Sequence, residues 1–178
     1  DRHAMRRLSF ALAVLLATTT IGGCSDPAPA HPNILVVVTD DQGWGDFGFN
    51  GNDIVETPVL DELAASSTVF DRFYVSPVCS STRASLLTGR HFLRTSVWSV
   101  TRGGEKMRTD ETTLGEHFKS AGYRTGLFGK WHNGAQYPYR ANDQGFETFF
   151  GFQGGHLTRY FDATLEENGR PVATTGFV

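Results

Sequence analysis

A continuous, mostly β-branched apolar run extends from Asn33 to Thr39 and consists mostly of Ile, Leu and Val. An unbroken run of this kind is typical of a strand that is covered on both faces, as in the middle of an α/β sheet. The run ends in a loop of acidic residues and glycines at positions 40–46. Because open α/β sheets bind ligands beyond the carboxyl ends of their strands, the pattern indicates a candidate site at this loop.

Segments with helical and strand patterns then alternate along the chain. Thr57 and Pro58 suit the N-cap and first turn of a helix. Thr113 and Glu116 have the spacing of a capping box, and Gly122 suits the position after the helix that they begin. The expected elements are strands at 33–39, 68–74 and 123–128, and helices at 58–65, 81–88 and 114–121. Strands that alternate with helices predict an α/β fold with a largely parallel sheet.

The first thirty residues have the pattern of an export signal. Arg6 and Arg7 form a basic start, and residues 10–17 form an apolar run that is too short to span a bilayer. The segment Ile21-Gly22-Gly23-Cys24 follows and resembles a bacterial lipobox, in which the cysteine is acylated. An ordinary cleaved signal with an incidental cysteine is the alternative interpretation.

These patterns predict three parts of the chain. Residues 1–23 are expected to be a leader and lipoprotein signal peptide, with the residues before Met5 as the leader, and residues 24–32 a proline-containing tether. Residues 33–178 are expected to form the folded domain. With a lipid on Cys24, the protein is expected to be an exported bacterial lipoprotein, anchored to a membrane and located in the periplasm or on the cell surface.

Composition narrows the class of protein. A hydrophobic fraction of 39% and a charged fraction of 20% are those of a globular chain. The net charge is −3, and no block of basic residues is present, so nucleic acid is not an expected partner. The chain has only 2 cysteines. If Cys24 carries lipid, Cys79 has no disulfide partner, and an unpaired cysteine in an exported domain is a candidate for chemistry.

Asp40 and Asp41 are two adjacent carboxylates at the end of the first expected strand. They repel each other unless a cation compensates their charge. Carboxylate oxygens are the ligands that Ca²⁺ and Mg²⁺ prefer, and Gly43 and Gly45 allow a tight loop around an ion. The pair therefore indicates a metal site, with a simple polar turn as the alternative.

Cys79 lies where the second expected helix begins, and Arg83 follows four residues later on the same helical face. The positive end of the helix dipole favours anionic ligands and activated nucleophiles, and a guanidinium group can donate two hydrogen bonds to an oxyanion. A buried cysteine beside a surface arginine is the alternative.

Lys130 and His132 follow the third expected strand and are two positions apart. In an extended segment their side chains point to the same side. A lysine and a histidine that converge on one pocket suit oxyanion binding and proton transfer. Taken singly, each residue has a simpler interpretation that the sequence favours: Lys130 as a solvated lysine and His132 as a locally satisfied histidine.

Three segments in this order resemble the sulfatase family of the alkaline-phosphatase-like superfamily. They are Asn33–Asp46, Cys79–Arg90 and Gly126–His132. The resemblance extends from about Pro32 to Val178. It implies the N-terminal part of a sulfatase catalytic domain, an α/β sandwich whose mostly parallel central sheet is flanked by helices and is incomplete in this chain.

The resemblance also implies a metal and a modified residue. Asp40 and Asp41 would ligate Ca²⁺, or Mg²⁺. Cys79 would be oxidised by a formylglycine-generating enzyme to formylglycine, whose hydrate would carry the nucleophilic hydroxyl and contact the metal. The implied reaction is hydrolysis of a sulfate ester, on an aryl compound or a carbohydrate such as a sulfated polysaccharide.

Three further residues receive roles from the resemblance. Arg83 would hold the hydrate and stabilise negative charge, Lys130 would bind a sulfate oxygen, and His132 would hydrogen-bond the hydrated formylglycine. A charged metal, two cations and a covalent intermediate together lower the barrier to transfer of an anionic group.

The chain departs from the family pattern at two positions and in its extent. Ser81 stands where the family has Pro or sometimes Ala, and Thr82 stands where it usually has Ser. The family's later metal and sulfate ligands have no counterpart, so these 178 residues alone are expected to be inactive and poorly soluble. Two alternatives remain: a phospho- or phosphonate-ester hydrolase, for which Ser80 or Ser81 is a candidate nucleophile, and a catalytically inactive binding module.

Overall fold

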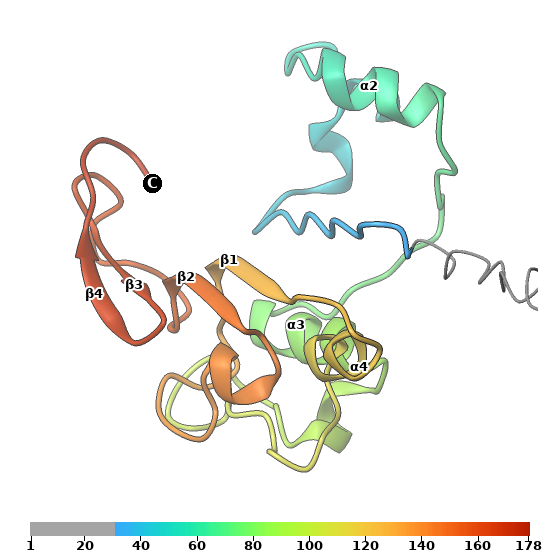
Figure 1. The fold of residues 1–178 in the computed structure, drawn as a ribbon. Coiled ribbons are helices and arrows are strands. Elements are labelled where there is room, and N and C mark those ends of the chain that lie inside the picture. Colours follow the sequence, from blue (N-terminus) through green and yellow to red (C-terminus); the bar gives the residue numbers. More distant parts are fainter. Residues whose placement is uncertain (1–30) are drawn as a thin grey trace, which may run out of the picture. The chain divides into compact units, whose positions relative to one another are not determined.

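The computed structural model describes residues 31–178 (Figure 1), and the chain divides into two units between Val38 and Thr39. The predicted strand at 33–39 is wrong: these residues form no strand, and the side chains of Leu35 and Val37 are 87% and 78% exposed. A strand needs the backbone groups of a neighbouring strand, and no segment within residues 31–178 pairs with this one.

The second unit begins with two short 3₁₀ helices, η1 (Trp44–Asp46) and η2 (Gly48–Asn50), followed by α2 (Pro58–Ala65). The bounds of α2 confirm the predicted helix. Thr57 occupies its N-cap position, but the Thr57 hydroxyl accepts a hydrogen bond from the Gly48 N–H at 2.8 Å instead of capping the helix. The same hydroxyl donates to Asp61, which joins η2 to α2.

The predicted strand at 68–74 is also wrong, because residues 68–74 are irregular and Phe70 and Tyr74 are exposed. The next regular element is α3 (Cys79–Thr88), which includes the predicted helix and extends it to Cys79 itself. A short 3₁₀ helix, η3 (Phe92–Thr95), follows and packs against α3.

The helix predicted from the capping box is α4 (Leu114–Ser120). The Thr113 hydroxyl accepts from the Glu116 N–H at 3.2 Å, and the Glu116 carboxylate accepts from the Thr113 N–H at 2.8 Å, which confirms the box. Gly122 follows with a φ of +85°, as its predicted position after the helix requires.

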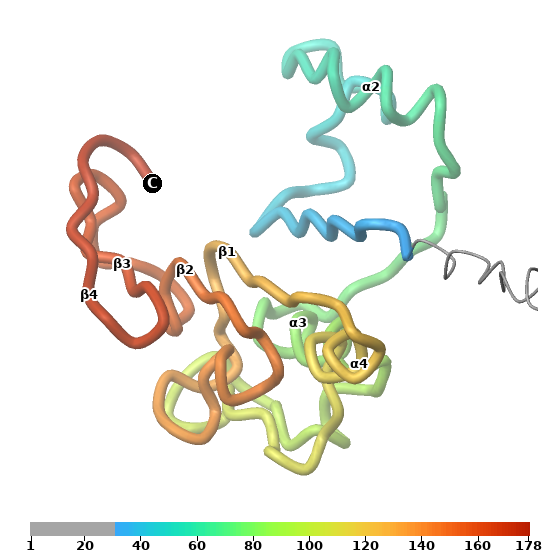
Figure 2. Tube along the Cα trace, in the orientation of Figure 1, coloured from blue at the N-terminus to red at the C-terminus, as the bar shows by residue number. Residues whose placement is uncertain are grey.

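The sheet has four strands in the order β1 (Gly126–Lys130), β2 (Thr148–Phe152), β3 (Thr164–Glu167) and β4 (Arg170–Ala173), which the trace in Figure 2 follows. β1 and β2 are parallel, with η4 (Ala141–Gln144) in their connection, whereas β2–β3 and β3–β4 are antiparallel. The strand predicted at 123–128 begins three residues later and ends at Lys130. The α/β class is confirmed as a mixed sheet with helices.

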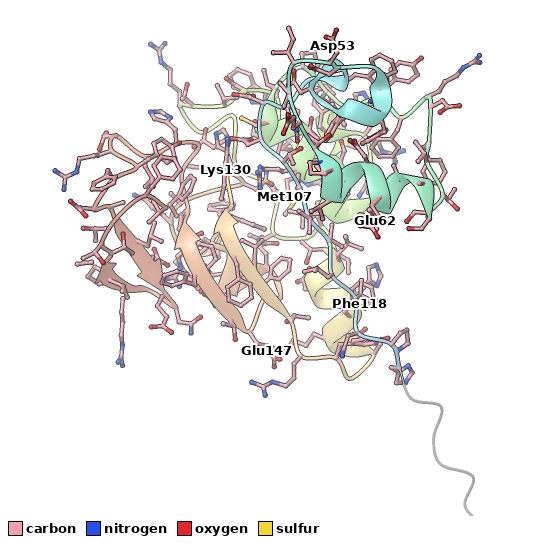
Figure 3. The ribbon with its side chains drawn as sticks, turned by 90° about the horizontal axis from the view of Figure 1, so that it is seen from above. Asp53, Glu62, Met107, Phe118, Lys130 and Glu147 are labelled. Atoms are coloured by element: carbon pink, nitrogen blue, oxygen red, sulfur yellow. The ribbon has the colours of Figure 1, made fainter. Side chains whose placement is uncertain are left out.

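The core of the second unit lies between α3, β2 and the segments that follow η3 and β1. Its fully buried members are Ala84, Val97, Met107, Trp131, Ala141 and Phe149. Trp131, directly after β1, donates its indole N–H to the Tyr139 carbonyl at 2.9 Å and packs edge-on against Phe146. This packing fixes the end of β1, where Lys130 lies (Figure 3).

Candidate active site

α3 presents Cys79 and Arg83 one turn apart. Cys79 is the first residue of the helix, and its N-cap residue, Val78, has no side chain that can accept a hydrogen bond from the first turn. The free N–H groups and the helix dipole therefore leave positive potential beside the Cys79 thiol. The Arg83 guanidinium donates to the Lys130 carbonyl at 2.6 Å, which ties α3 to the end of β1.

His132 contacts the thiol from the other side. Its Nδ1 lies 3.2 Å from the Cys79 Sγ, and its Nε2 lies 2.9 Å from the Val100 carbonyl oxygen. The extended backbone predicted here is wrong at His132, whose φ is +66°. The left-handed conformation turns the chain after Lys130, so that Lys130 and His132 reach different partners within one cluster.

Three charged side chains complete the cluster. The Lys130 ammonium lies 2.8 Å from one oxygen of Asp40, and Arg83 lies 3.6 Å from the other oxygen. Burial on its own raises the pKa of Asp40, but the hydrogen bond and charge of Lys130, together with Arg83, outweigh it and hold this pKa below its ordinary value. Asp40 is therefore ionised at neutral pH.

His132 has its pKa lowered as well. Burial is the largest cause, the hydrogen bond to the Val100 carbonyl opposes it, and the charges of Lys130 and Arg83 add to the lowering. The imidazole is therefore neutral at neutral pH, and a neutral imidazole can accept a proton from a group on residue 79.

Asp40 and Asp41 are the donors available to a hard cation. Asp41 is exposed, with a φ of +54°, and residues 31–178 contain no group of three or more His, Cys, Asp and Glu side chains that could hold a metal ion. The two carboxylates therefore fit Ca²⁺ or Mg²⁺ in kind but supply only part of a ligand set. In this structure Lys130 and Arg83 compensate the Asp40 charge.

The three residues after Cys79 are held in different ways. The buried Ser80 hydroxyl donates to the Ser99 carbonyl at 2.7 Å, and the Thr82 hydroxyl donates to the Ser76 carbonyl at 3.0 Å. The Ser81 hydroxyl is buried and has no hydrogen-bond partner within residues 31–178. Neither serine is presented to solvent, so the geometry does not favour Ser80 or Ser81 as a nucleophile.

Five of the predicted residues therefore meet in one cluster, which consists of Asp40, Cys79, Arg83, Lys130 and His132. Asp41 is next to the cluster in sequence and takes part in none of its contacts among the described residues. Cys24, the predicted lipidation site, lies outside the described residues.

Two neighbours of His132 were not predicted from the sequence. The Val100 carbonyl binds the ring, and a backbone carbonyl has no sequence signal. Gly155 packs against the ring so closely that a Cβ there would lie 2.5 Å from its Cε1 and Nε2 atoms. The paired glycines at 154 and 155 were the available signal, because close backbone approach selects glycine.

Known proteins of one family are similar to this chain. The model of the family described as Sulfatase matches residues 32–169. The N-acetylgalactosamine-6-sulfatase of Mus musculus is 35% identical over 167 residues, which are 88% of this chain and 32% of the relative. Arylsulfatase G of Canis lupus familiaris is 40% identical over 159 residues, 82% of this chain and 30% of the relative.

The fold is also similar to that of a solved protein. The crystal structure of Ps i-CgsB superimposes with a TM-score of 0.70 at 31% identity and covers 79% of this chain and 37% of that one. The chain thus spans about a third of the length of the curated relatives that it matches.

Proposed function

The chain belongs to the sulfatase family, and on this premise we propose that the protein hydrolyses a sulfate ester. The observation that carries the proposal is the meeting of Cys79, Arg83, Lys130 and His132 at the N-terminus of α3. Two cations and a helix N-terminus form an anion-binding environment beside a nucleophile position. The neutral His132 imidazole, 3.2 Å from the Cys79 Sγ, adds a proton acceptor to this environment.

The nucleophile in this proposal is residue 79 after oxidation of its thiol to formylglycine by a separate maturation enzyme. Formylglycine at residue 79 would supply a hydrated aldehyde, and with it a hydroxyl group as nucleophile. His132 is placed to accept a proton through Nδ1, because that atom faces residue 79. Arg83 and Lys130 neutralise negative charge on the sulfate group as it is transferred.

The metal in this proposal is Ca²⁺, or Mg²⁺, held in part by Asp40 and Asp41. A bound divalent cation supplies further positive charge to the sulfate group and to the attacking oxygen. Lys130 and Arg83 already contact Asp40, at 2.8 and 3.6 Å, so a bound cation would share this carboxylate with two positive side chains.

The substrate class that the relatives support is a sulfated carbohydrate or an aryl sulfate. One relative is named for a sulfated N-acetylgalactosamine and another is named an arylsulfatase. The proposal includes export as a lipoprotein through Cys24, which would place the enzyme where sulfated polysaccharides occur. No helix within residues 31–178 is long and apolar enough to cross a membrane.

Mass spectrometry of the tryptic peptide Phe73–Arg83 tests the proposal, on full-length protein from its native host. We expect formylglycine at residue 79, together with turnover of an aryl sulfate that exceeds turnover of the matching aryl phosphate. Cys79→Ala is expected to remove activity, because alanine cannot form the aldehyde. Cysteine alone at residue 79, with no turnover of sulfate, would refute the mechanism and favour a binding module.

A faster reaction with the aryl phosphate, retained in Cys79→Ala, would instead favour the phospho-ester alternative. Metal binding tests the proposed Ca²⁺ site. Asp41→Asn is expected to weaken Ca²⁺ binding measured by calorimetry, because it removes one anionic ligand.

A further inference from the structure

The two ring nitrogens of His132 have different kinds of partner. Nε2 lies 2.9 Å from the Val100 carbonyl oxygen, which can only accept a hydrogen bond. Nε2 must therefore carry a hydrogen. In a neutral ring Nδ1 then carries none, and it faces the Cys79 Sγ at 3.2 Å as an acceptor. The position of the Val100 carbonyl thus decides which nitrogen is available to residue 79.

Ser80 contacts the residue that precedes this carbonyl. Its hydroxyl donates to the Ser99 carbonyl at 2.7 Å, one residue before Val100. The Ser80 carbonyl accepts from the Asn133 side chain at 3.0 Å, one residue after His132. Ser80 and Asn133 are both fully buried, and the bond between them is shielded from water.

These bonds link three segments in pairs. Four hydrogen bonds join residues 79–80, 99–100 and 132–133. The loop that carries Val100 is closed by a second device, because Trp98 and Ser99 both donate their N–H groups to the Gly104 carbonyl, at 2.8 and 3.1 Å. The loop is therefore held by the Gly104 carbonyl through two backbone hydrogen bonds and by the Ser80 hydroxyl through a third bond, at Ser99.

We infer that Ser80 is a positioning residue: its buried hydroxyl holds the Ser99–Val100 peptide so that the Val100 carbonyl keeps His132 in the Nε2–H tautomer. The tautomer is a property of the folded chain. Its consequence for catalysis rests on the proposed function, because Nδ1 must accept a proton from residue 79.

Ser81 provides a matched control. It is the next residue of the same helix and is 1% exposed, but its hydroxyl has no partner among the described residues. Removing the Ser81 hydroxyl changes buried volume as much as removing the Ser80 hydroxyl does, without loss of a hydrogen bond. A role of Ser80 as mere core filler predicts the same behaviour for both alanine variants.

Nitrogen NMR on uniformly ¹⁵N-labelled full-length protein, at a pH where His132 is neutral, measures the tautomer directly. The His132 signals are assigned by their absence from His132→Gln. We expect the Nε2–H tautomer in the parent protein and in Ser81→Ala, and a mixture of both tautomers in Ser80→Ala. Ser80→Cys, which keeps a weak donor of similar size, is expected to be intermediate.

Kinetics on the matured enzyme provide the second measurement, with rates divided by the formylglycine fraction of each preparation. Ser80→Ala is expected to lower kcat by about 10-fold, part of the roughly 10²–10⁴-fold of general acid–base catalysis, with little change in KM.

The Nδ1–H tautomer in the parent protein would overturn the inference without any variant. An unchanged tautomer in a folded Ser80→Ala would overturn it as well. If the tautomers shift as expected while no preparation hydrolyses a sulfate ester, the positioning role stands and the proposed function fails.

Discussion

The Lys130 ammonium lies 2.8 Å from the Asp40 carboxylate, 90 residues earlier in the chain. The Lys130 side chain is 9% exposed and the Asp40 side chain 43%. The Lys130 side chain is thus nearly buried, while part of the Asp40 carboxylate remains exposed to solvent. Asp40 can reach a cation from that side without leaving the lysine, and any such cation then lies near a positive charge.

Lys130→Met should tighten Ca²⁺ binding to the full-length protein. The variant removes a like charge from the neighbourhood of the metal, so we expect the Kd to fall by about 3–10-fold, on the order of 1 kcal/mol. Isothermal titration calorimetry measures this. Lys119→Met, which disrupts only the surface ion pair of Lys119 with Glu147 at 3.8 Å, should leave the Kd unchanged. Weaker binding in Lys130→Met would mean that the lysine mainly orients Asp40.

Ser81→Ala should stabilise the protein, whereas Ser80→Ala should destabilise it. A buried hydroxyl without a partner costs about 1–3 kcal/mol, so its removal is expected to raise the free energy of unfolding by about 1 kcal/mol. Loss of the Ser80 hydroxyl leaves the Ser99 carbonyl without its donor, with a loss of about 1–3 kcal/mol. Urea unfolding measures both values, and equal effects would contradict the assigned contacts.

Gly155→Ala should impair the reaction through His132. A Cβ at this position would lie 2.5 Å from the imidazole, so the ring must move away from Val100 or Cys79. A displacement of about 1 Å can cost on the order of 10²-fold in rate, so a fall of kcat of that size is expected. Gly154→Ala is the control, because its Cβ would meet only the His156 carbonyl oxygen, at 3.9 Å. A parent-like kcat in Gly155→Ala would show that the ring has room to shift.

Asp143→Asn should destabilise the protein at neutral pH but not in acid. The side-chain hydrogen bond with Arg140 lowers the pKa of Asp143; burial opposes it, and a backbone hydrogen bond and the Arg140 charge add to the lowering. Because the folded pKa lies below the ordinary value of 3.8, the ion pair stabilises the protein above that pH. Its contribution is lost as the pH falls through the folded pKa.

Urea unfolding across this pH range measures the difference between the parent and Asp143→Asn. We expect about 1 kcal/mol at pH 7, shrinking progressively below pH 3.8. Asp110→Asn is the control, since Asp110 is 70% exposed in its pair with Arg108 and should contribute about 0.5 kcal/mol or less. A difference that stays constant into acid would exclude the ionised carboxylate as its source.

Elements with local signals were predictable from the sequence. α2 and α4 agree with their predicted starts because a first-turn proline and a capping box act within four residues. The strands predicted at 33–39 and 68–74 failed for the opposite reason. A strand forms only against a partner, and an apolar run does not reveal whether that partner is present.

The site was predictable as a set of residues but not as a geometry. The resemblance to the sulfatases selected five side chains that the structure brings together. It did not indicate the left-handed backbone at His132 or its contacts with Val100 and Gly155. These depend on backbone positions far apart in sequence, which side-chain identity does not specify. Ser81 is the converse case, in which a departure from the family pattern leaves a buried hydroxyl without a partner among residues 31–178.

The hydrogen bond between Ser80 and Asn133 joins residues that are 53 positions apart. It can form only after the ribosome has added the residues between them. Ribosomes add about 5–20 residues per second, so about 3–11 s pass between the synthesis of Ser80 and that of the residue that encloses it. During this interval Cys79 and its neighbours are available in an unfolded segment. An enzyme that modifies Cys79 by reading the residues beside it has access to them during this interval, and slower elongation between residues 80 and 133 would lengthen it.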